Sequence, residues 1–339
     1  MLADGYVGRA NSLNCLRLVF AAFVMVSHSF PLGGFGADPV VGDTSLGGIG
    51  VAGFFCISGF LITGSRARLS FGRYVTRRVF RIVPGYWAVL VVVGFGISAL
   101  IAGSTVAWNF KSAIEYVVAG LALLVRQSSA LNGVLSGLPY TGGINGSLWT
   151  LAPEFAFYLA LGLIFGFGWI RNKYWLGFVV LVATGVYGQC FVPQVMFLPD
   201  VLSLLTFFLA GVSLWQAAPK VPLNIWLFGG AFILLLASFA TGHFRFFGAL
   251  PAAYCVLYAG VRLPSVFRRM GSKNDYSFGL YIYAFPVQQL LARLEVQEFG
   301  VWAFIAASAV CIAPFAAASW WLIEKPSQRL SLRLTRTPA

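Results

Sequence analysis

The chain has few charged residues and only two histidines. Charged residues make up 10% of its 339 residues, whereas 59% are hydrophobic and 16% are aromatic. Soluble domains carry about 25% charged residues. A composition this poor in charge excludes an ordinary soluble enzyme and predicts a multi-pass membrane protein.

The alternation of polar and apolar residues that a membrane β-barrel needs is also missing. The apolar runs are instead long enough to cross a hydrocarbon layer of about 30 Å as helices. We therefore predict an all-α integral membrane protein with about ten transmembrane helices. The predicted spans are residues 13–31, 46–65, 81–103, 146–169, 174–191, 199–216, 223–241, 245–261, 275–294 and 300–323. The first is expected to be retained, because it ends without a small-residue cleavage site.

The five cysteines show no spacing typical of a metal or redox site. Each stands alone in an apolar segment, at Cys15, Cys56, Cys190, Cys255 and Cys311. We expect them to be buried and reduced, and we expect no metal.

The formal net charge of +13 follows from membrane topology. With both termini cytoplasmic, 19 of the 23 Lys and Arg residues fall in cytoplasmic segments, as the positive-inside rule requires. The charge therefore needs no nucleic acid partner. Residues 104–145 are expected to form an external re-entrant or interfacial segment, because the run from Lys111 to Arg126 is short and carries Glu115. We expect one membrane domain at 1–326 and a short basic cytoplasmic tail at 327–339.

Arg17 and His28 lie in the first predicted span. Eleven helical steps bring both side chains to nearly the same face, about 16 Å apart. Ionisable residues at membrane depth usually mark a functional path. A histidine there can also hydrogen-bond a neighbouring helix, but an imidazole is the usual general base for a hydroxyl. We favour a catalytic His28.

Arg78 and Arg81 stand one helical turn apart, just before Pro84. Paired guanidinium groups suit phosphate, because each presents a planar fork of donors. The pair fits a phosphorylated cofactor at the inner face, whereas Arg66, Arg68 and Arg73 are interpreted as topology anchors.

Glu154 lies near the outer end of the fourth predicted span, where a carboxylate needs a partner or water. A structural ion pair and a role in orienting the acceptor or His28 both remain open. For the other polar features we favour structural roles. Gly48–Gly53 and Ser58 are assigned to helix packing, His243 to an external turn, Tyr281, Tyr283 and Phe285-Pro286 to aromatic packing, and Glu324 to a helix end.

Six sequence blocks, in order across nearly the whole chain, resemble the acyltransferase 3 family of integral-membrane acyltransferases. They are Arg17 with His28, Phe54-Phe55-Cys56-Ile57-Ser58-Gly59-Phe60-Leu61, Arg78-Val79-Phe80-Arg81-Ile82-Val83-Pro84, Trp149 to Tyr158, Tyr276-Ser277-Phe278-Gly279-Leu280-Tyr281, and Ile323-Glu324-Lys325-Pro326. Two places depart from the family pattern. Ala284 stands where the family often has a histidine before Phe-Pro, and Ala152-Pro153 is expected to shift the local helix start.

The resemblance implies transfer of an acyl group, usually acetyl from acetyl-CoA, to a sugar hydroxyl of an extracytoplasmic or lipid-linked glycan. By position, His28 and Glu154 would be catalytic, and Arg17, Arg78 and Arg81 would serve the CoA substrate. His28 as a general base and His28 as an acyl carrier both remain open. A multi-pass protein of the bacterial inner membrane is expected, with acyl-CoA, a glycan acceptor and membrane lipid as partners.

A transporter or flippase of a lipid-linked sugar or anion is the alternative. In that interpretation His28 couples protons and the arginines are anchors. No inverted repeat supports it.

Overall fold

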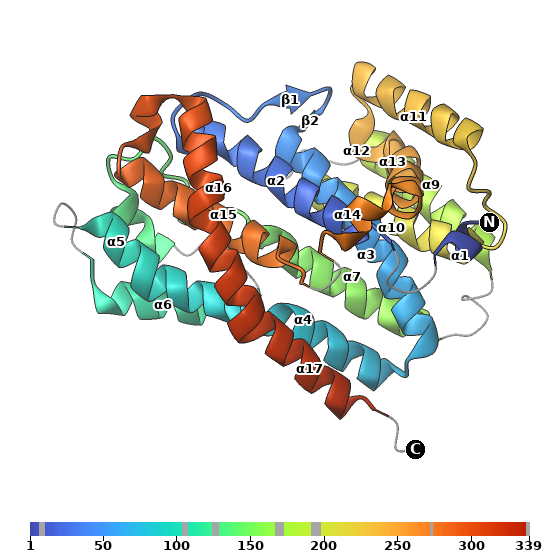
Figure 1. The fold of residues 1–339 in the computed structure, drawn as a ribbon, viewed down its shortest axis with the longest axis horizontal. Coiled ribbons are helices and arrows are strands. Elements are labelled where there is room, and N and C mark those ends of the chain that lie inside the picture. The colour runs from blue at the N-terminus through green and yellow to red at the C-terminus, as the bar shows by residue number, and fades with distance from the viewer. Residues whose placement is uncertain are drawn as a thin grey trace. The chain divides into compact units, whose positions relative to one another are not determined.

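The computed structural model is almost entirely helical (Figure 1). It describes residues 1–6, 11–103, 108–123, 129–166, 173–190, 198–271 and 274–336. The strands in this part of the chain are β1 (Val40–Val41) and β2 (Thr44–Ser45), which pair antiparallel. The prediction of an all-α membrane protein is confirmed at this level.

Five helical runs among the described residues are long and apolar enough to cross a membrane. They are Leu13–Leu32, Leu46–Arg68, Phe71–Ala102, Leu198–Ala217 and Val301–Leu334. Shorter apolar helices lie at Leu148–Ile164, Leu176–Gly188 and Ile225–Ala240. The number of ten spans and their orientation stay predictions. Three of the 19 basic residues predicted to be cytoplasmic, Arg9, Arg171 and Lys273, lie outside the described residues, as does Arg126 of the predicted external segment.

The chain divides into two compact units. The first comprises Met1–Phe20, Val40–Val75 and Ala156–Asp275, and the second comprises Ala21–Pro39, Thr76–Phe155 and Tyr276–Ala339. Three continuous helices contribute residues to both units: α2 (Leu13–Leu32), α4 (Phe71–Val91) and α7 (Leu151–Ile164).

The first unit packs around the crossing of α3 and α10. Its other helices are α1 (Leu2–Gly5), α9 (Tyr174–Cys190), α11 (Ile225–Ala240), α12 (Phe244–Phe247), α13 (Ala249–Arg262) and α14 (Ser265–Arg269). Where α3 (Leu46–Arg68) meets α10 (Leu198–Ala217), a Cβ on Gly59 would lie 2.0 Å from the Phe208 carbonyl oxygen. A Cβ on Gly211 would lie 2.2 Å from that of Cys56. Only glycines permit this approach of two helix backbones.

The glycine-rich run from Gly48 to Gly53 lies inside α3. A Cβ on Gly53 would lie 2.4 Å from the Phe20 ring, so this glycine allows close packing, as predicted. Ser58 accepts a hydrogen bond from the Tyr158 hydroxyl of α7 at 3.1 Å. The prediction that Ser58 joins two helices is also confirmed.

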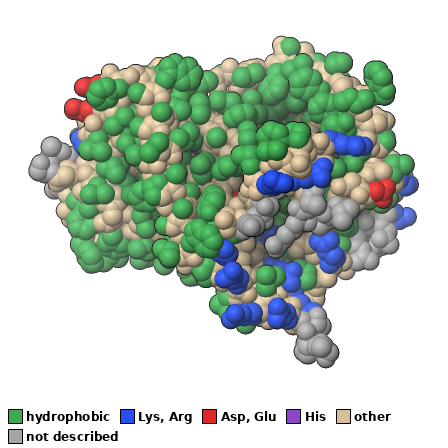
Figure 2. Space-filling model, viewed as in Figure 1, with side chains coloured by type: hydrophobic (Ala, Val, Ile, Leu, Met, Phe, Trp, Pro, Cys, Tyr) green, Lys and Arg blue, Asp and Glu red, His purple; other side chains and the backbone are tan. Residues whose placement is uncertain are grey.

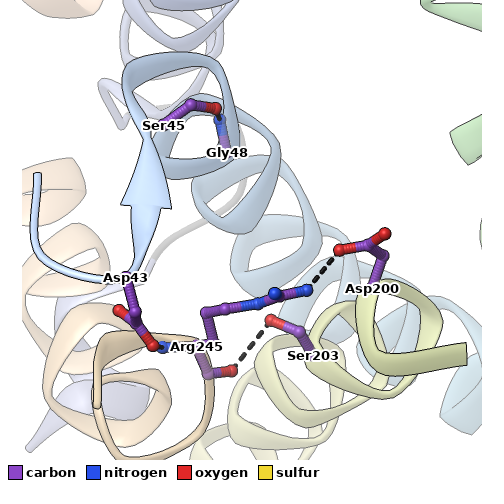
Figure 3. Close-up of polar contacts among 6 residues, drawn as sticks. All are labelled: Asp43, Ser45, Gly48, Asp200, Ser203 and Arg245. Carbon is purple, nitrogen blue, oxygen red and sulfur yellow. Dashed lines mark hydrogen bonds and ion pairs between the residues drawn. The ribbon is translucent and has the colours of Figure 1, made fainter. Parts of the chain in front are cut away.

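One group of polar residues in the first unit is tightly joined; we call it the Arg245 cluster (Asp43, Asp200, Ser203 and Arg245; Figure 3). The Asp43 carboxylate accepts from the backbone N–H groups of Phe244 and Arg245 at 3.0 and 3.2 Å. The Arg245 guanidinium pairs with Asp200, and Ser203 Oγ donates to the Arg245 carbonyl at 2.8 Å. The cluster therefore connects the loop after β1 with α10 and α12. His243, predicted in an external turn, precedes α12.

The second unit is built from two long helical runs and α15 (Ser277–Arg293), which packs against α16 (Val301–Ala318). One run joins α4 to the π-helical η1 (Val92–Ile97) and α5 (Ser98–Ala102). The other joins α16 to the π-helical η5 (Ser319–Glu324) and α17 (Lys325–Leu334). The predicted tail from residue 327 thus forms most of α17. Shorter elements are α6 (Phe110–Gly120) and the 3₁₀ turns η2 (Ser129–Leu135), η3 (Leu148–Thr150) and η4 (Val296–Phe299).

Helix α6 packs against η1 and α4. The Tyr86 hydroxyl donates to the Gly120 carbonyl at 2.7 Å, and a Cβ on Gly94 would meet Val117 at 3.1 Å. Its 11 residues extend only about 16 Å. This length supports a re-entrant or interfacial helix rather than a span.

Many large hydrophobic side chains are exposed among the described residues. Figure 2 shows hydrophobic side chains over most of the face drawn, whereas most of the Lys and Arg side chains lie in its right-hand and lower part. Trp302 and Val310 of α16 are 77% and 72% exposed.

The burial prediction was wrong for two cysteines. All five are free, and Cys15, Cys56 and Cys255 are buried, but Cys190 is exposed and Cys311 is only partly covered. An apolar run does not distinguish a helix face that meets protein from one that meets lipid, since lipid chains are as apolar as leucine.

Candidate active site

Arg17 lies in the first unit, on the starting half of α2. Its Nη1 donates to Oδ2 of Asp275 at 3.0 Å, and the two side chains are only 19% and 10% exposed. The guanidinium also lies over the Phe54 ring, 5.8 Å from its centroid. A buried charge needs such a partner. Asp275, directly before α15, therefore fixes the Arg17 side chain.

His28 lies in the second unit, near the end of α2. Its ring meets Phe285 of α15 edge to face, with the centroids 5.2 Å apart. The Nδ1 atom is buried and has no hydrogen-bond partner in the described part of the chain. Beside it, Ser27 Oγ donates to Oδ1 of Asp38 at 2.6 Å.

Gln288 of α15 supports the turn of α2 that carries His28. Its Nε2 donates to the Met25 carbonyl at 2.9 Å and to Ser29 Oγ at 2.7 Å. The residue is 0% exposed. These two bonds hold the helix on both sides of His28.

Glu154 lies in the first turn of α7. The helix begins at Leu151 and accommodates Pro153 in that turn, where a backbone N–H has no partner within the helix. Glu154 lies four residues, or one helical turn, after Thr150, which directly precedes α7. The Tyr281 hydroxyl bonds Thr150 Oγ1 at 2.6 Å.

Helix α15 brings the surroundings of Glu154 and His28 together. Tyr281, which bonds Thr150 one turn before Glu154, and Phe285, which contacts His28, are four residues apart and therefore share one face of α15. The two predicted catalytic residues thus belong to segments that contact adjacent turns of the same helix.

The segment between η2 and η3 follows α15 in the antiparallel direction. Arg293 Nη2 donates to the Ser136 carbonyl at 2.9 Å, and Gln289 Nε2 donates to the carbonyls of Tyr140 and Gly143 at 3.1 and 3.0 Å. Nearer the start of α15, Tyr281 Oη donates to the Ser147 carbonyl at 2.9 Å. The segment is held to the helix along its length.

Two prolines each leave a backbone carbonyl without its usual helical donor, and a side chain from a distant segment bonds that carbonyl instead. Pro286 lacks the N–H that would bond the Ile282 carbonyl four residues earlier, and Asn145 Nδ2 donates to that carbonyl at 3.0 Å. Pro84 of α4 likewise leaves the Phe80 carbonyl without its helical donor, and Ser327 Oγ of α17 donates to it at 2.7 Å. Each proline thus opens a backbone acceptor that a distant residue uses.

Three rings form an aromatic row (Tyr140, Phe285 and His28). Tyr140 and Phe285 have centroids 5.7 Å apart, and Phe285 contacts His28. Gly146 lies against the middle ring, because a Cβ there would be 2.6 Å from Phe285 Cε2. The row therefore leads from the segment that follows η2 to the histidine.

Arg78 and Arg81 stand one turn apart on α4, in the second unit. The Arg81 guanidinium lies over the Phe278 ring of α15, 6.0 Å from its centroid. Nearby, Arg77 Nε donates to Thr335 Oγ1 at 3.0 Å. Their placement on one helix agrees with the sequence argument.

The five predicted site residues therefore fall into three places. His28 and Glu154 border one face of α15, and Arg78 and Arg81 share α4 in the same unit. Arg17 belongs to the other unit, and the continuous helix α2 connects it to His28 over about 16 Å.

Sequence reasoning missed Asp275, Asp38, Gln288, Gln289 and Asn145. The two adjacent glutamines inside an apolar run carried a usable signal, because polar side chains at membrane depth bond another helix or mark a site. Asp275 stands next to the Tyr276–Tyr281 block, where a buried partner for Arg17 was needed. Asp38 and Asn145 have no periodic neighbours, and only the fold places them.

The fold and these residues describe a helical membrane protein in which one helix carries a histidine with a buried Nδ1 atom and another carries paired arginines. The model of the acyltransferase domain of the acyltransferase 3 family matches residues 10–323. The chain therefore belongs to this family and is a membrane acyltransferase.

Two relatives cover nearly the whole chain. An O-acetyl transferase of Shigella phage Sf6 is 27% identical over 94% of this chain and 96% of its own. Nodulation protein 10 of Rhizobium leguminosarum bv. viciae is 28% identical, over 96% and 95%. No solved structure matches the chain.

Proposed function

We propose that the protein is an O-acyltransferase of the bacterial inner membrane that moves an acetyl group from cytoplasmic acetyl-CoA to a hydroxyl of an extracytoplasmic or lipid-linked glycan. The observation that carries the proposal is the buried, unpartnered Nδ1 of His28, one α15 turn from the surroundings of Glu154. The phage relative, named an O-acetyl transferase, supports the acyl group. Ten spans with both termini cytoplasmic complete the proposed topology.

In this proposal His28 is the general base. A ring nitrogen takes the proton of the acceptor hydroxyl as its oxygen bonds to the thioester carbonyl carbon. The carbon–sulfur bond then breaks, and the CoA thiolate takes the proton from the imidazolium. The products are the acylated sugar and CoA, and His28 returns to its neutral form.

The donor side belongs to the arginines. Arg78 and Arg81 lie on the predicted cytoplasmic half of α4 and offer two guanidinium groups to the CoA phosphates. Arg17, held by Asp275, marks the inner part of α2 and lies about 16 Å from His28 along the helix. This distance suits the extended pantetheine arm of CoA.

The acceptor side belongs to Glu154. Its carboxylate lies at the start of α7, one helical turn after Thr150, and Thr150 bonds Tyr281, which anchors the segment along α15. From there it orients the sugar hydroxyl or polarises His28. We expect Glu154→Gln to lower glycan acylation while acetyl-CoA binding is retained.

The test is transfer of label from [¹⁴C]acetyl-CoA to glycan in membranes that contain the full chain. His28→Ala should lower transfer by at least about 100-fold, because general acid–base catalysis contributes 10²- to 10⁴-fold. His243→Ala is the matched control, since it removes the second histidine at the start of α12. Sugar movement across the membrane without acyl transfer would identify a flippase instead.

A second measurement separates the two roles of His28. Acid-quenched reactions without acceptor should contain no label bound to the protein if His28 is only a base. Label on the wild type that disappears in His28→Ala would make His28 the acyl carrier.

A further inference from the structure

Two adjacent glutamines of α15 are fully buried, yet each leaves its side-chain oxygen without a hydrogen-bond partner. Gln288 and Gln289 are both 0% exposed. A buried acceptor without a donor costs about 1–3 kcal/mol. Two such atoms on neighbouring residues beside a histidine call for a physical reason.

The orientation of the Gln288 amide is fixed by its surroundings. Its Nε2 faces the Met25 carbonyl and Ser29 Oγ. Ser29 Oγ already donates its own hydrogen to the Met25 carbonyl at 3.0 Å, so it accepts from Gln288. A flipped amide would place Oε1 against the Met25 carbonyl, which can only accept. The Oε1 atom must therefore point away from α2.

The same argument fixes Gln289. Its Nε2 donates to two backbone carbonyls, Tyr140 and Gly143. A flipped amide would oppose oxygen to oxygen at both. The free atom of each glutamine is therefore an acceptor, and neither side chain can offer a donor in its place.

The two amides flank the aromatic row. Positions 288 and 289 lie three and four residues after Phe285, so both side chains stand one turn above its ring. Gln288 bonds the α2 side, next to His28, and Gln289 bonds the side of the segment that carries Tyr140. In the proposed topology this turn lies on the outer side of Phe285, where the acceptor enters.

We propose that the Oε1 atoms of Gln288 and Gln289 bind hydroxyl groups of the acceptor, and that this part of the acceptor is a neutral, hydroxyl-rich sugar. Hydroxyl groups supply the hydrogen atoms that the two oxygens need, whereas phosphate and carboxylate groups present acceptors only. The proposal rests on the proposed function, because it places the sugar beside the histidine that activates it.

The test measures sugar binding directly, on the full chain in lipid nanodiscs with empty nanodiscs as background. The probes are the methyl glycosides of glucose, galactose, mannose and rhamnose, with glucose 6-phosphate as the anionic probe, detected by saturation-transfer NMR. Wild type should bind at least one neutral glycoside more tightly than glucose 6-phosphate. Gln288→Met and Gln289→Met should each weaken that binding about 10-fold, the value of one hydrogen bond.

Matched controls separate the free oxygens from the anchoring bonds. Ser29→Ala removes an anchor of the Gln288 amide, and Asn145→Ala removes another attachment of the segment to α15. Both keep the free oxygens and should change sugar binding by less than about 3-fold. Acetyl-CoA binding by each variant verifies the fold.

Three results would overturn the proposal: no glycoside bound by wild type, preference for the phosphorylated sugar, or equal losses in the methionine variants and their controls. Transfer from [¹⁴C]acetyl-CoA is measured on the same samples. Glutamine-dependent sugar binding without any acyl transfer would leave the sugar site in place and reject the proposed function.

Discussion

The Arg245 cluster and the surroundings of His28 differ in how far their polar groups are hydrogen-bonded. In the cluster, Asp43 accepts two backbone N–H groups, Arg245 pairs with Asp200, and Ser203 bonds the Arg245 carbonyl (Figure 3). Around His28, the imidazole Nδ1 and two buried glutamine oxygens have no partner within the described chain.

The difference concerns what each region is for. The paired polar groups of the cluster fix one loop against its helices. Unpaired buried groups reduce the free energy of unfolding unless a ligand completes their hydrogen bonds. The comparison therefore supports a structural role for the cluster and agrees with the function proposed for the histidine region.

After the loss of His28 itself, the largest effect should come from Gly146→Ala. The added Cβ would lie 2.6 Å from Phe285 Cε2 and would push this ring from its contact with His28. A displacement near 1 Å can cost about 100-fold in rate, so we expect kcat for acyl transfer to fall by about that factor. Gly133→Ala is the control, because its Cβ would meet nothing within 4 Å. Equal activity of both variants would show that the aromatic row does not position His28.

Replacing Arg78 and Arg81 together by Ala should raise KM for acetyl-CoA by about 30-fold. Partly exposed ion pairs contribute up to about 1 kcal/mol each, and two of them correspond to about 30-fold. Salt should weaken wild-type donor binding further. The measurement is KM at several salt concentrations, with Arg73→Ala on the same helix as control. An unchanged KM would move the CoA site away from α4.

Arg17 tests whether paired polar groups are always structural. It is paired with Asp275, like the residues of the Arg245 cluster, yet it is predicted to belong to the site. Arg17→Lys keeps the charge but loses the planar fork of donors. We expect transfer to fall about 10-fold with little change in thermal unfolding. If the unfolding midpoint falls while transfer is unchanged, Arg17 has a structural role only and does not belong to the site.

The smallest effect on activity should come from Asp43→Ala. Two backbone N–H groups of α12 lose their acceptor, which should lower the free energy of unfolding by about 1–2 kcal/mol. The thermal midpoint should therefore drop while kcat and KM of the folded fraction stay within a factor of about two. A selective loss of acceptor use would give the Arg245 cluster a part in binding.

Much of the architecture was accessible from the sequence. Charge scarcity and the length of the apolar runs predicted an all-helical membrane protein, and glycines at close crossings such as Gly53 were interpreted correctly. The burial of Cys190 and Cys311 was not, because hydropathy gives the same value for a surface in lipid and a surface in protein.

Some residues of the candidate site could likewise be predicted from the sequence, and others could not. Arg17 and His28 are eleven residues apart on one helix, so helical periodicity alone placed them on a common face. Asp275 lies 258 residues from Arg17 in sequence, and no local pattern connects them. No local pattern indicated the role of Asn145 either. Pro286 predicted only that, in a helix, the carbonyl four residues earlier would lack its usual donor.

The sequence by itself determined that the chain forms apolar helices and which helix carries the histidine, because both follow from local hydropathy and helix geometry. Only the tertiary structure decided which polar atoms are paired. Hydrogen bonds form between groups that the fold brings within about 3 Å, and the partners of Gln288, Gln289 and Arg17 come from segments far along the chain. The unpaired acceptors beside His28 exist only because those long-range contacts use every donor of the two amides.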